Sequence, residues 1–203
     1  MKNEDVQSVN SSPLDGISQE EKGLVHPFAQ FLYCPKCGSG RFVVNNEKSK
    51  RCEDCGFVYY FNPSAATVAV IRNKRGEVLC ARRAKEPARG TLDLPGGFCD
   101  CYETGEEGVV REVMEETGLR VARTQFLFSI PNQYEYSHFL VHTIDMFFLC
   151  EVEDEGEGGD APVMRAMDDV AELMWKPLSE LRSEDFGLKS VARGVEKIKK
   201  ILI

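Results

Sequence analysis

Short apolar runs divide most of the chain into candidate strands, and two stretches carry apolar residues at helical spacing. Runs bounded by turn-forming residues predict strands at residues 65–71, 78–82, 121–128, 138–151 and 172–176. Apolar positions three and four residues apart predict one helix over residues 105–117 and another from about residue 188 to the end. The chain from Ser64 onward therefore combines strands with two helices.

The N-terminal part of the chain has a different pattern. Residues 1–25 are polar and rich in Ser, Asn, Glu and Gln, so we expect a disordered or poorly ordered lead. Residues 41–44 and the run to Arg51 predict two short strands around a turn at Asn45–Asn46. We therefore expect three segments, which are the lead at 1–25, a small unit at 26–62 and a larger domain at 63–203.

Two Cys-x-x-Cys pairs lie within the small unit, separated by fourteen residues. Thiols in this pattern, with a glycine after each pair, are typical of a tetrahedral zinc site, here Cys34, Cys37, Cys52 and Cys55. Such a site leaves no position for a substrate water, so we expect structural zinc. Two disulfides are the alternative. The N-terminus has no apolar signal-peptide core, which predicts a cytoplasmic protein with reduced thiols and favours zinc.

Composition excludes some partners. The chain has 203 residues, 42% of them hydrophobic, and no apolar stretch approaches a membrane span, so we expect no membrane partner. Its formal net charge of −8 disfavours a broad surface for polyanions. Basic residues of the small unit leave nucleic-acid binding there as an alternative to our first expectation, a scaffolding or homodimer-forming role.

The predicted helix at 105–117 carries an unusual concentration of acidic side chains. Thr104 and Glu107 form a capping-box pattern before it, and Gly118 predicts its end. Three glutamates project from neighbouring positions of one face, Glu112, Glu115 and Glu116. Like charges one turn apart destabilise a helix unless a cation lies among them, and magnesium prefers carboxylate oxygens. A solvated acidic face is the alternative explanation.

The sequence around this helix identifies a family. It reads LPGGFCDCYETGEEGVVREVMEETGL, with Gly97, a glutamate after five further residues, and Arg-Glu-apolar-x-Glu-Glu-x-Gly-apolar after seven more. This segment resembles the Nudix box, the signature of hydrolases that cut a phosphoanhydride joining a nucleoside diphosphate to another group. The order of predicted elements also resembles the Nudix fold, an α/β (α+β) sandwich with a mixed sheet between helices. A small zinc ribbon would precede it.

The resemblance implies a role for each position of the box. The carbonyl of Gly96 and the carboxylates of Glu112 and Glu116 would be ligands of Mg²⁺ or Mn²⁺. Glu115 would be a further ligand or the base that acts through a metal-bound water, and all three glutamates would be catalytic. Four residues would be structural, with Glu103 paired to Arg111: Gly97, Glu103, Arg111 and Gly118.

Substrate choice is less strongly indicated. A zinc ribbon before a Nudix domain resembles the NADH pyrophosphatases, which have a Ser-Gln-Pro-Trp element after the box, whereas this chain has Ser-Ile-Pro-Asn-Gln-Tyr at residues 129–134. We therefore expect a nucleoside diphosphate linked to another group, such as NADH, ADP-ribose or FAD. Candidate substrate contacts are Arg82, Tyr134, Tyr136 and His138. The tyrosines resemble the base-stacking tyrosine of diadenosine polyphosphate hydrolases, with strand packing as the alternative.

Two other functions remain alternatives. One is hydrolysis at the end of a nucleotide-capped RNA, with the ribbon guiding the strand. The other is a non-catalytic nucleotide-sensing module, which has no need to crowd three carboxylates. Some local features have two interpretations: Cys99 and Cys101 form a redox-sensitive pair or are simply small loop residues, and the acidic residues 153–160 supply a base or form a solvated loop.

Overall fold

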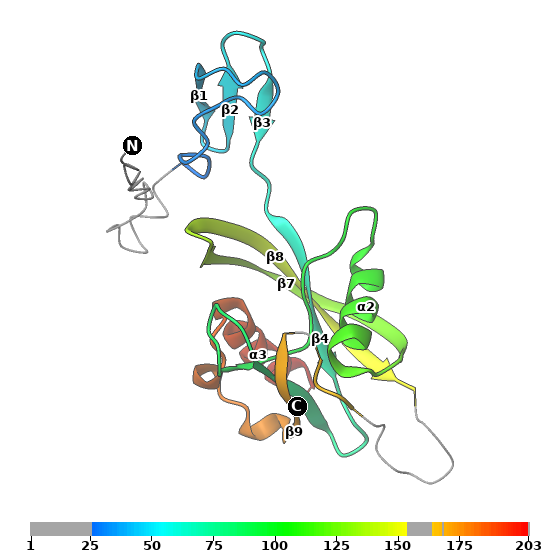
Figure 1. Ribbon diagram of the computed structural model, residues 1–203. Coiled ribbons are helices and arrows are strands. Elements are labelled where there is room, and N and C mark those ends of the chain that lie inside the picture. The colour runs from blue at the N-terminus through cyan, green and yellow to red at the C-terminus, as the bar shows by residue number, and fades with distance from the viewer. Residues whose placement is uncertain (1–25, 154–163, 168, 203) are drawn as a thin grey trace, which may run out of the picture. The chain divides into compact units, whose positions relative to one another are not determined.

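The computed structural model describes residues 26–153, 164–167 and 169–202 (Figure 1). The chain forms two compact units. The described part of the first unit ends at Asn62 and also includes Ser137–Leu140, and the second comprises Pro63–Tyr136 and the chain from Val141 onward. Within the described residues, no helix is both long and apolar enough to cross a membrane.

The first unit contains a three-stranded antiparallel sheet in the order β1 (Phe42–Asn46), β2 (Ser49–Cys52) and β3 (Val58–Tyr60). The turn predicted at Asn45–Asn46 was wrong, because Asn46 is the last residue of β1. The Asn46 side-chain oxygen accepts a hydrogen bond from the backbone N–H of Lys48 at 3.1 Å, so this asparagine initiates the turn formed by Glu47 and Lys48. The third strand was not predicted.

The second unit contains two three-stranded sheets, with strand orders β4-β8-β7 and β6-β5-β9. The strands β4 and β8 pair in parallel, whereas β5 pairs antiparallel with both β6 and β9. The bounds are β4 Ser64–Ile71, β5 Glu77–Arg83, β6 Leu92–Asp93, β7 Val121–Tyr136, β8 Phe139–Val152 and β9 Val170–Pro177. The mixed arrangement that the sequence predicts is therefore confirmed.

Alternate residues of the strands supply two separate hydrophobic cores. In β4, Val68 and Val70 belong to one core, whereas Ala69 and Ile71 belong to the other. Helix α2 (Gly105–Thr117) contributes Val109 and Val113 to the second core, and helix α3 (Lys189–Leu202) contributes Val191, Val195 and Ile198 to the first. Because side chains of a strand alternate between its faces, the two helices cover opposite faces, as Figure 1 shows. This is a helix–sheet–helix sandwich.

The predicted elements agree with the structure in kind but differ in extent. Helix α2 has the predicted bounds, and α3 begins one residue later than expected. Strand β7 continues eight residues beyond the predicted end at residue 128, through Pro131. Proline is tolerated there because β7 is an edge strand of its sheet. The backbone groups on its outer side need no hydrogen-bond partner from a neighbouring strand. Strand β6 and two short 3₁₀ helices, Leu178–Glu180 and Ser183–Asp185, were not predicted.

Candidate active site and zinc site

Helix α2 is fixed at both ends by its own side chains and backbone. The Thr104 hydroxyl accepts a hydrogen bond from the Glu107 N–H at 3.2 Å, and the Glu107 carboxylate accepts one from the Thr104 N–H at 2.8 Å. At the other end, Gly118 adopts a left-handed conformation with φ of 72° and donates to the Met114 carbonyl at 3.0 Å. The reciprocal cap and the glycine stop hold the helix, and therefore its glutamates, in a defined position.

The three glutamates in the second half of α2 differ in exposure. Glu116 is 8% exposed, the Glu112 side chain is 14% exposed, and that of Glu115 is 50% exposed. The Glu116 carboxylate accepts a hydrogen bond from the Gly96 N–H at 3.0 Å, which ties the helix to the loop before it. The cluster thus extends from a buried carboxylate to one that solvent reaches easily.

The loop that faces these carboxylates requires glycine at two consecutive positions. A Cβ atom on Gly96 would lie 2.1 Å from the Thr67 carbonyl oxygen, and one on Gly97 would lie 2.6 Å from a Glu112 carboxylate oxygen. The Gly97 carbonyl accepts a hydrogen bond from the Thr67 N–H of β4 at 2.7 Å. The absence of side chains lets the loop pass between β4 and α2 and brings its backbone up to the carboxylates.

Arg111 connects the loop to two of the glutamates. Its guanidinium forms two hydrogen bonds to Glu103, at 2.8 and 2.9 Å, and one to the Phe98 carbonyl at 2.9 Å. It also donates to Glu112 at 2.8 Å and to Glu115 at 3.0 Å. Arg111 therefore orients both carboxylates while its bidentate contact to Glu103 fixes the guanidinium itself.

Burial and pairing shift the acidic groups in opposite directions. Burial raises the pKa of Glu116 to about 8, and the nearby charges of Glu112 and Asp93 act in the same sense. Hydrogen bonds from Arg111, followed by one from the Asp100 N–H, lower the pKa of Glu103 to about 2. A carboxylate with the surroundings of Glu116 is ionised at neutral pH most readily when a cation lies against it. Oxygen donors of this kind suit a hard divalent cation such as Mg²⁺.

A cavity of about 380 Å³ extends from Gly96, Gly97 and Glu116. Tyr134 and Tyr136 also line it, and burial raises the pKa of Tyr134 to about 12. The other two candidate substrate contacts, Arg82 and His138, are not among its lining residues. Arg82 donates instead to Glu172 and to the Gly90 carbonyl, each at 3.0 Å. His138 belongs to the first unit, in the turn between β7 and β8.

Several polar groups of this cavity were not predicted from the sequence, among them Arg83 and Asp145. Arg83, adjacent to the expected Arg82, lines it and forms a 2.5 Å ion pair with the buried Asp93, whose pKa is raised by burial and lowered in part by this pairing. Asp145 lies at its wall and accepts hydrogen bonds from the side chains of Asn132, Thr143 and Ser190. An acidic residue in the middle of the apolar run 138–151 was the available signal, because a buried charge needs such partners.

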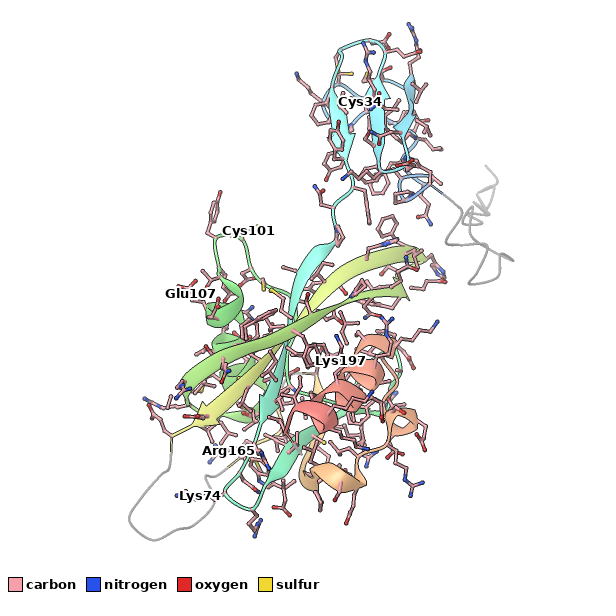
Figure 2. The ribbon with its side chains drawn as sticks, turned by 180° about the vertical axis from the view of Figure 1, so that it is seen from behind. Cys34, Lys74, Cys101, Glu107, Arg165 and Lys197 are labelled. Atoms are coloured by element: carbon pink, nitrogen blue, oxygen red, sulfur yellow. The ribbon has the colours of Figure 1, made fainter. Side chains whose placement is uncertain are left out.

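Other candidate residues lie apart from the cavity. Cys99 is partly buried, which raises the pKa of its thiol, whereas Cys101 is exposed in the loop before α2 (Figure 2). Glu172, whose role the sequence left open, pairs with Arg82. The acidic residues 154–160 lie outside the described residues.

The four cysteines of the first unit converge on one point. Their sulfur atoms all lie within 4.8 Å of one another, with Cys34 to Cys55 at 3.8 Å and Cys37 to Cys52 at 3.6 Å. A tetrahedron with zinc–sulfur bonds of about 2.3 Å has sulfur–sulfur edges of roughly 3.8 Å. Backbone N–H groups, first that of Cys55, face Cys52 and lower the pKa of its thiol. The cluster therefore has the geometry and the donors to hold a zinc ion.

The sequence model of the NUDIX domain matches residues 62–195. The chain belongs to the Nudix family. It is 35% identical over 124 residues to an ADP-ribose pyrophosphatase from Methanocaldococcus jannaschii, covering 60% of this chain and 66% of that protein. It is 31% identical to an NAD-capped RNA hydrolase, NudC, from Chromobacterium violaceum, covering 66% of this chain and 46% of that protein.

Solved structures show the same Nudix fold. A NUDIX hydrolase from Nitrosomonas europaea superimposes with a TM-score of 0.61 at 21% identity, covering 83% of this chain and 90% of that one. The NUDIX domain of NrtR from Shewanella oneidensis, in complex with ADP-ribose, superimposes with a TM-score of 0.52 at 20% identity, covering 71% of this chain and 91% of that one. The chain spans less than two thirds of the length of the two curated relatives above.

Proposed function

We propose that this protein is a divalent-metal-dependent hydrolase of the phosphoanhydride in a nucleoside diphosphate linked to another group. The observation that carries the proposal is the approach of Glu112 and Glu116 to the Gly96–Gly97 loop, where Glu116 lines a cavity of about 380 Å³ and Arg111 contacts both Glu112 and Glu115. The two curated relatives support the chemistry, because their names describe cleavage of ADP-ribose and of NAD-capped RNA. Both substrates contain a diphosphate bridge.

The residues of the α2 face would hold Mg²⁺ or Mn²⁺. The ligands would be the carboxylates of Glu112 and Glu116 together with the carbonyl of Gly96. When bound, the metal neutralises the diphosphate and lowers the pKa of a coordinated water. Most of the cost of gathering three carboxylates on one helix face is then offset by the cation.

The remaining residues of the site position these groups. Arg111 keeps Glu112 and Glu115 in orientation through its contacts with both, and Glu103 keeps Arg111 in place. We assign the half-exposed Glu115 as the carboxylate that accepts a proton from the attacking water, because solvent can exchange there, and Glu116 as a ligand throughout. Tyr134 and Tyr136 supply apolar surface for a base or second ring in the cavity.

The first unit has a structural role in this proposal. Zinc would be bound by Cys34, Cys37, Cys52 and Cys55, leaving no open coordination position, so the ribbon at residues 26–62 would have no part in the chemistry of the Nudix domain at residues 63–203. A fold stabilised by so few buried residues, Phe42 among them, depends on its metal.

A substrate panel tests the proposed function. Purified protein with Mg²⁺ is incubated with ADP-ribose, NADH, NAD⁺ and FAD in water labelled with ¹⁸O, and the products are analysed by mass spectrometry. We expect two monophosphate products from at least one substrate, with the label in a phosphate group, because attack falls on phosphorus. Label on a ribose carbon, or no turnover of any of the four substrates, would contradict the proposal.

A further inference from the structure

The outer face of α3 is strongly basic in an acidic protein. The helix contains five basic residues and one acidic residue, Glu196, although the whole chain has a formal net charge of −8. Lys189, Arg193, Lys197 and Lys200 are all exposed. They recur every three or four residues, which places them along one face of the helix. Figure 2 labels Lys197 on this surface.

Helix stability does not account for this distribution. Cations are favourable near the C-terminus of a helix, which explains Lys199 and Lys200. The same dipole makes a cation unfavourable at the first residue of the helix, where Lys189 lies. Arg193, one turn further, donates to the Pro131 carbonyl of β7 at 2.6 Å, and Lys197 lies 4.7 Å from the Phe128 ring. The two cations are thus held beside β7.

A second cavity, of about 640 Å³, opens at the beginning of this basic face. It is lined by Lys189 and Arg193 of α3 and by Gln133 and His142 of the β7–β8 hairpin. Burial lowers the pKa of His142, so this ring is neutral at neutral pH and acts through hydrogen bonding. The cavity thus combines positive charge with hydrogen-bonding groups, the two features that recognise phosphodiesters and sugars.

The second cavity adjoins the first. Asn132 and Thr143 line both of them. These two residues are 6% and 2% exposed, so they form a wall that the two cavities share. The lining is acidic on the side of Glu116 and basic on the side of Lys189 and Arg193, which suits a substrate whose reacting diphosphate binds metal and whose continuation carries further phosphates.

We propose that the second cavity and the basic face of α3 (Lys189, Arg193, Lys197 and Lys200) bind the phosphodiester backbone of a single-stranded RNA whose nucleotide-capped 5′ end occupies the active site. The inference deepens the proposed function and rests on it for the position of the capped end. It also assigns the path of the strand to α3 and not to the zinc ribbon. An anionic membrane is the poorer partner, because the apolar face of α3 is buried, Val191, Val195 and Ile198 being at most 1% exposed.

Two triple variants separate the candidate RNA surfaces. R193Q/K197Q/K200Q removes three charges from α3, and K36Q/K48Q/R51Q removes three from exposed positions of the ribbon. Binding of a 20-nucleotide single-stranded RNA with a 5′ NAD cap is measured between about 50 and 200 mM salt. Each lost phosphate contact reduces the slope of log K against log salt by about 0.7, so we expect the α3 variant to lose about 2 in slope and the ribbon variant to retain it.

Kinetics and a conservative variant complete the test. The α3 triple variant should hydrolyse free NAD⁺ at the wild-type rate but lose roughly tenfold or more in kcat/KM on the capped RNA at low salt. R193K/K197R/K200R, which keeps the charges, should restore activity on the capped RNA. Thermal unfolding of each variant checks the fold.

Each other result overturns the inference. An α3 variant with the wild-type salt slope contradicts it, as does a loss confined to the ribbon variant. Loss of binding to vesicles with one-third phosphatidylserine, with RNA binding unchanged, would identify a membrane surface instead. A failure of the proposed hydrolase function would give a different result. The wild-type protein would then bind the RNA with an affinity that falls steeply with salt, yet would hydrolyse neither free NAD⁺ nor the capped RNA.

Discussion

The two candidate metal sites of this protein are constructed in opposite ways. Four thiols on two short turns form the first, and two of their sulfur–sulfur distances, 3.6 and 3.8 Å, are close to the edge of a zinc tetrahedron. The second has carboxylates of unequal exposure on one helix, a glycine loop against them, and an arginine that contacts two of them. The first arrangement has no room for a further ligand, whereas the second faces a cavity. The comparison teaches that site geometry separates a stabilising metal from a reactive one.

The largest expected effect comes from the buried carboxylate. Glu116→Gln should reduce kcat on the best substrate of the panel by ~100-fold or more, because it removes a metal ligand while preserving the shape of the side chain. Glu106→Gln is the matched control, since Glu106 is exposed on the same helix and lies outside the cavity. Near-normal turnover in folded Glu116→Gln protein would show that the Glu116 carboxylate is not part of the catalytic metal site.

Removal of zinc should affect the first unit and leave the chemistry of the second largely intact. Elemental analysis of reduced protein should give one zinc per chain, and Cys52→Ser should abolish it and destabilise the first unit. We expect turnover of a free dinucleotide to fall much less than in Glu116→Gln, because the carboxylate cluster belongs to the second unit. A zinc-free protein with a fully ordered ribbon in NMR spectra would contradict this prediction.

The stacking role of Tyr134 should have a smaller effect. Tyr134→Ala should raise KM by about tenfold with little change in kcat, if the ring only holds a base and contributes equally to ground state and transition state. Tyr102→Ala is the control, because Tyr102 is fully exposed in the loop before α2. A fall in kcat with unchanged KM would reject the stacking role.

The smallest effect concerns stability at low pH. Because the pKa of Glu103 is lowered from near 4.5 to about 2 in the folded protein, this carboxylate stabilises the fold above pH 4.5, and that stabilisation is lost as pH falls toward 2. The difference in unfolding free energy between wild type and Glu103→Gln should therefore be constant above about pH 5 and shrink below it. Urea denaturation at a series of pH values measures it, and a pH-independent difference would contradict the assignment.

Local signals in the sequence were sufficient for some features and insufficient for others. Thr104, Glu107 and Gly118 predicted the limits of α2 because capping depends on residues next to the helix. The partners of Asp145 could not be found this way, since Asn132, Thr143 and Ser190 come from different elements that only the fold brings together. The sequence also could not show that Arg83, and not Arg82, lines the cavity. Neighbouring residues of a strand face opposite sides, and nothing in the sequence indicated which side held the cavity.

Metal binding by the glutamates of α2 can be measured by titration with Mn²⁺ followed by electron paramagnetic resonance. Wild-type protein, with zinc retained in its ribbon, should remove free Mn²⁺ signal with saturable binding that Mg²⁺ competes away. Glu116→Gln should bind Mn²⁺ at least ~10-fold more weakly, and Glu106→Gln should match the wild type. Equal Mn²⁺ affinity in all three proteins would show that the glutamates of α2 are not the metal site.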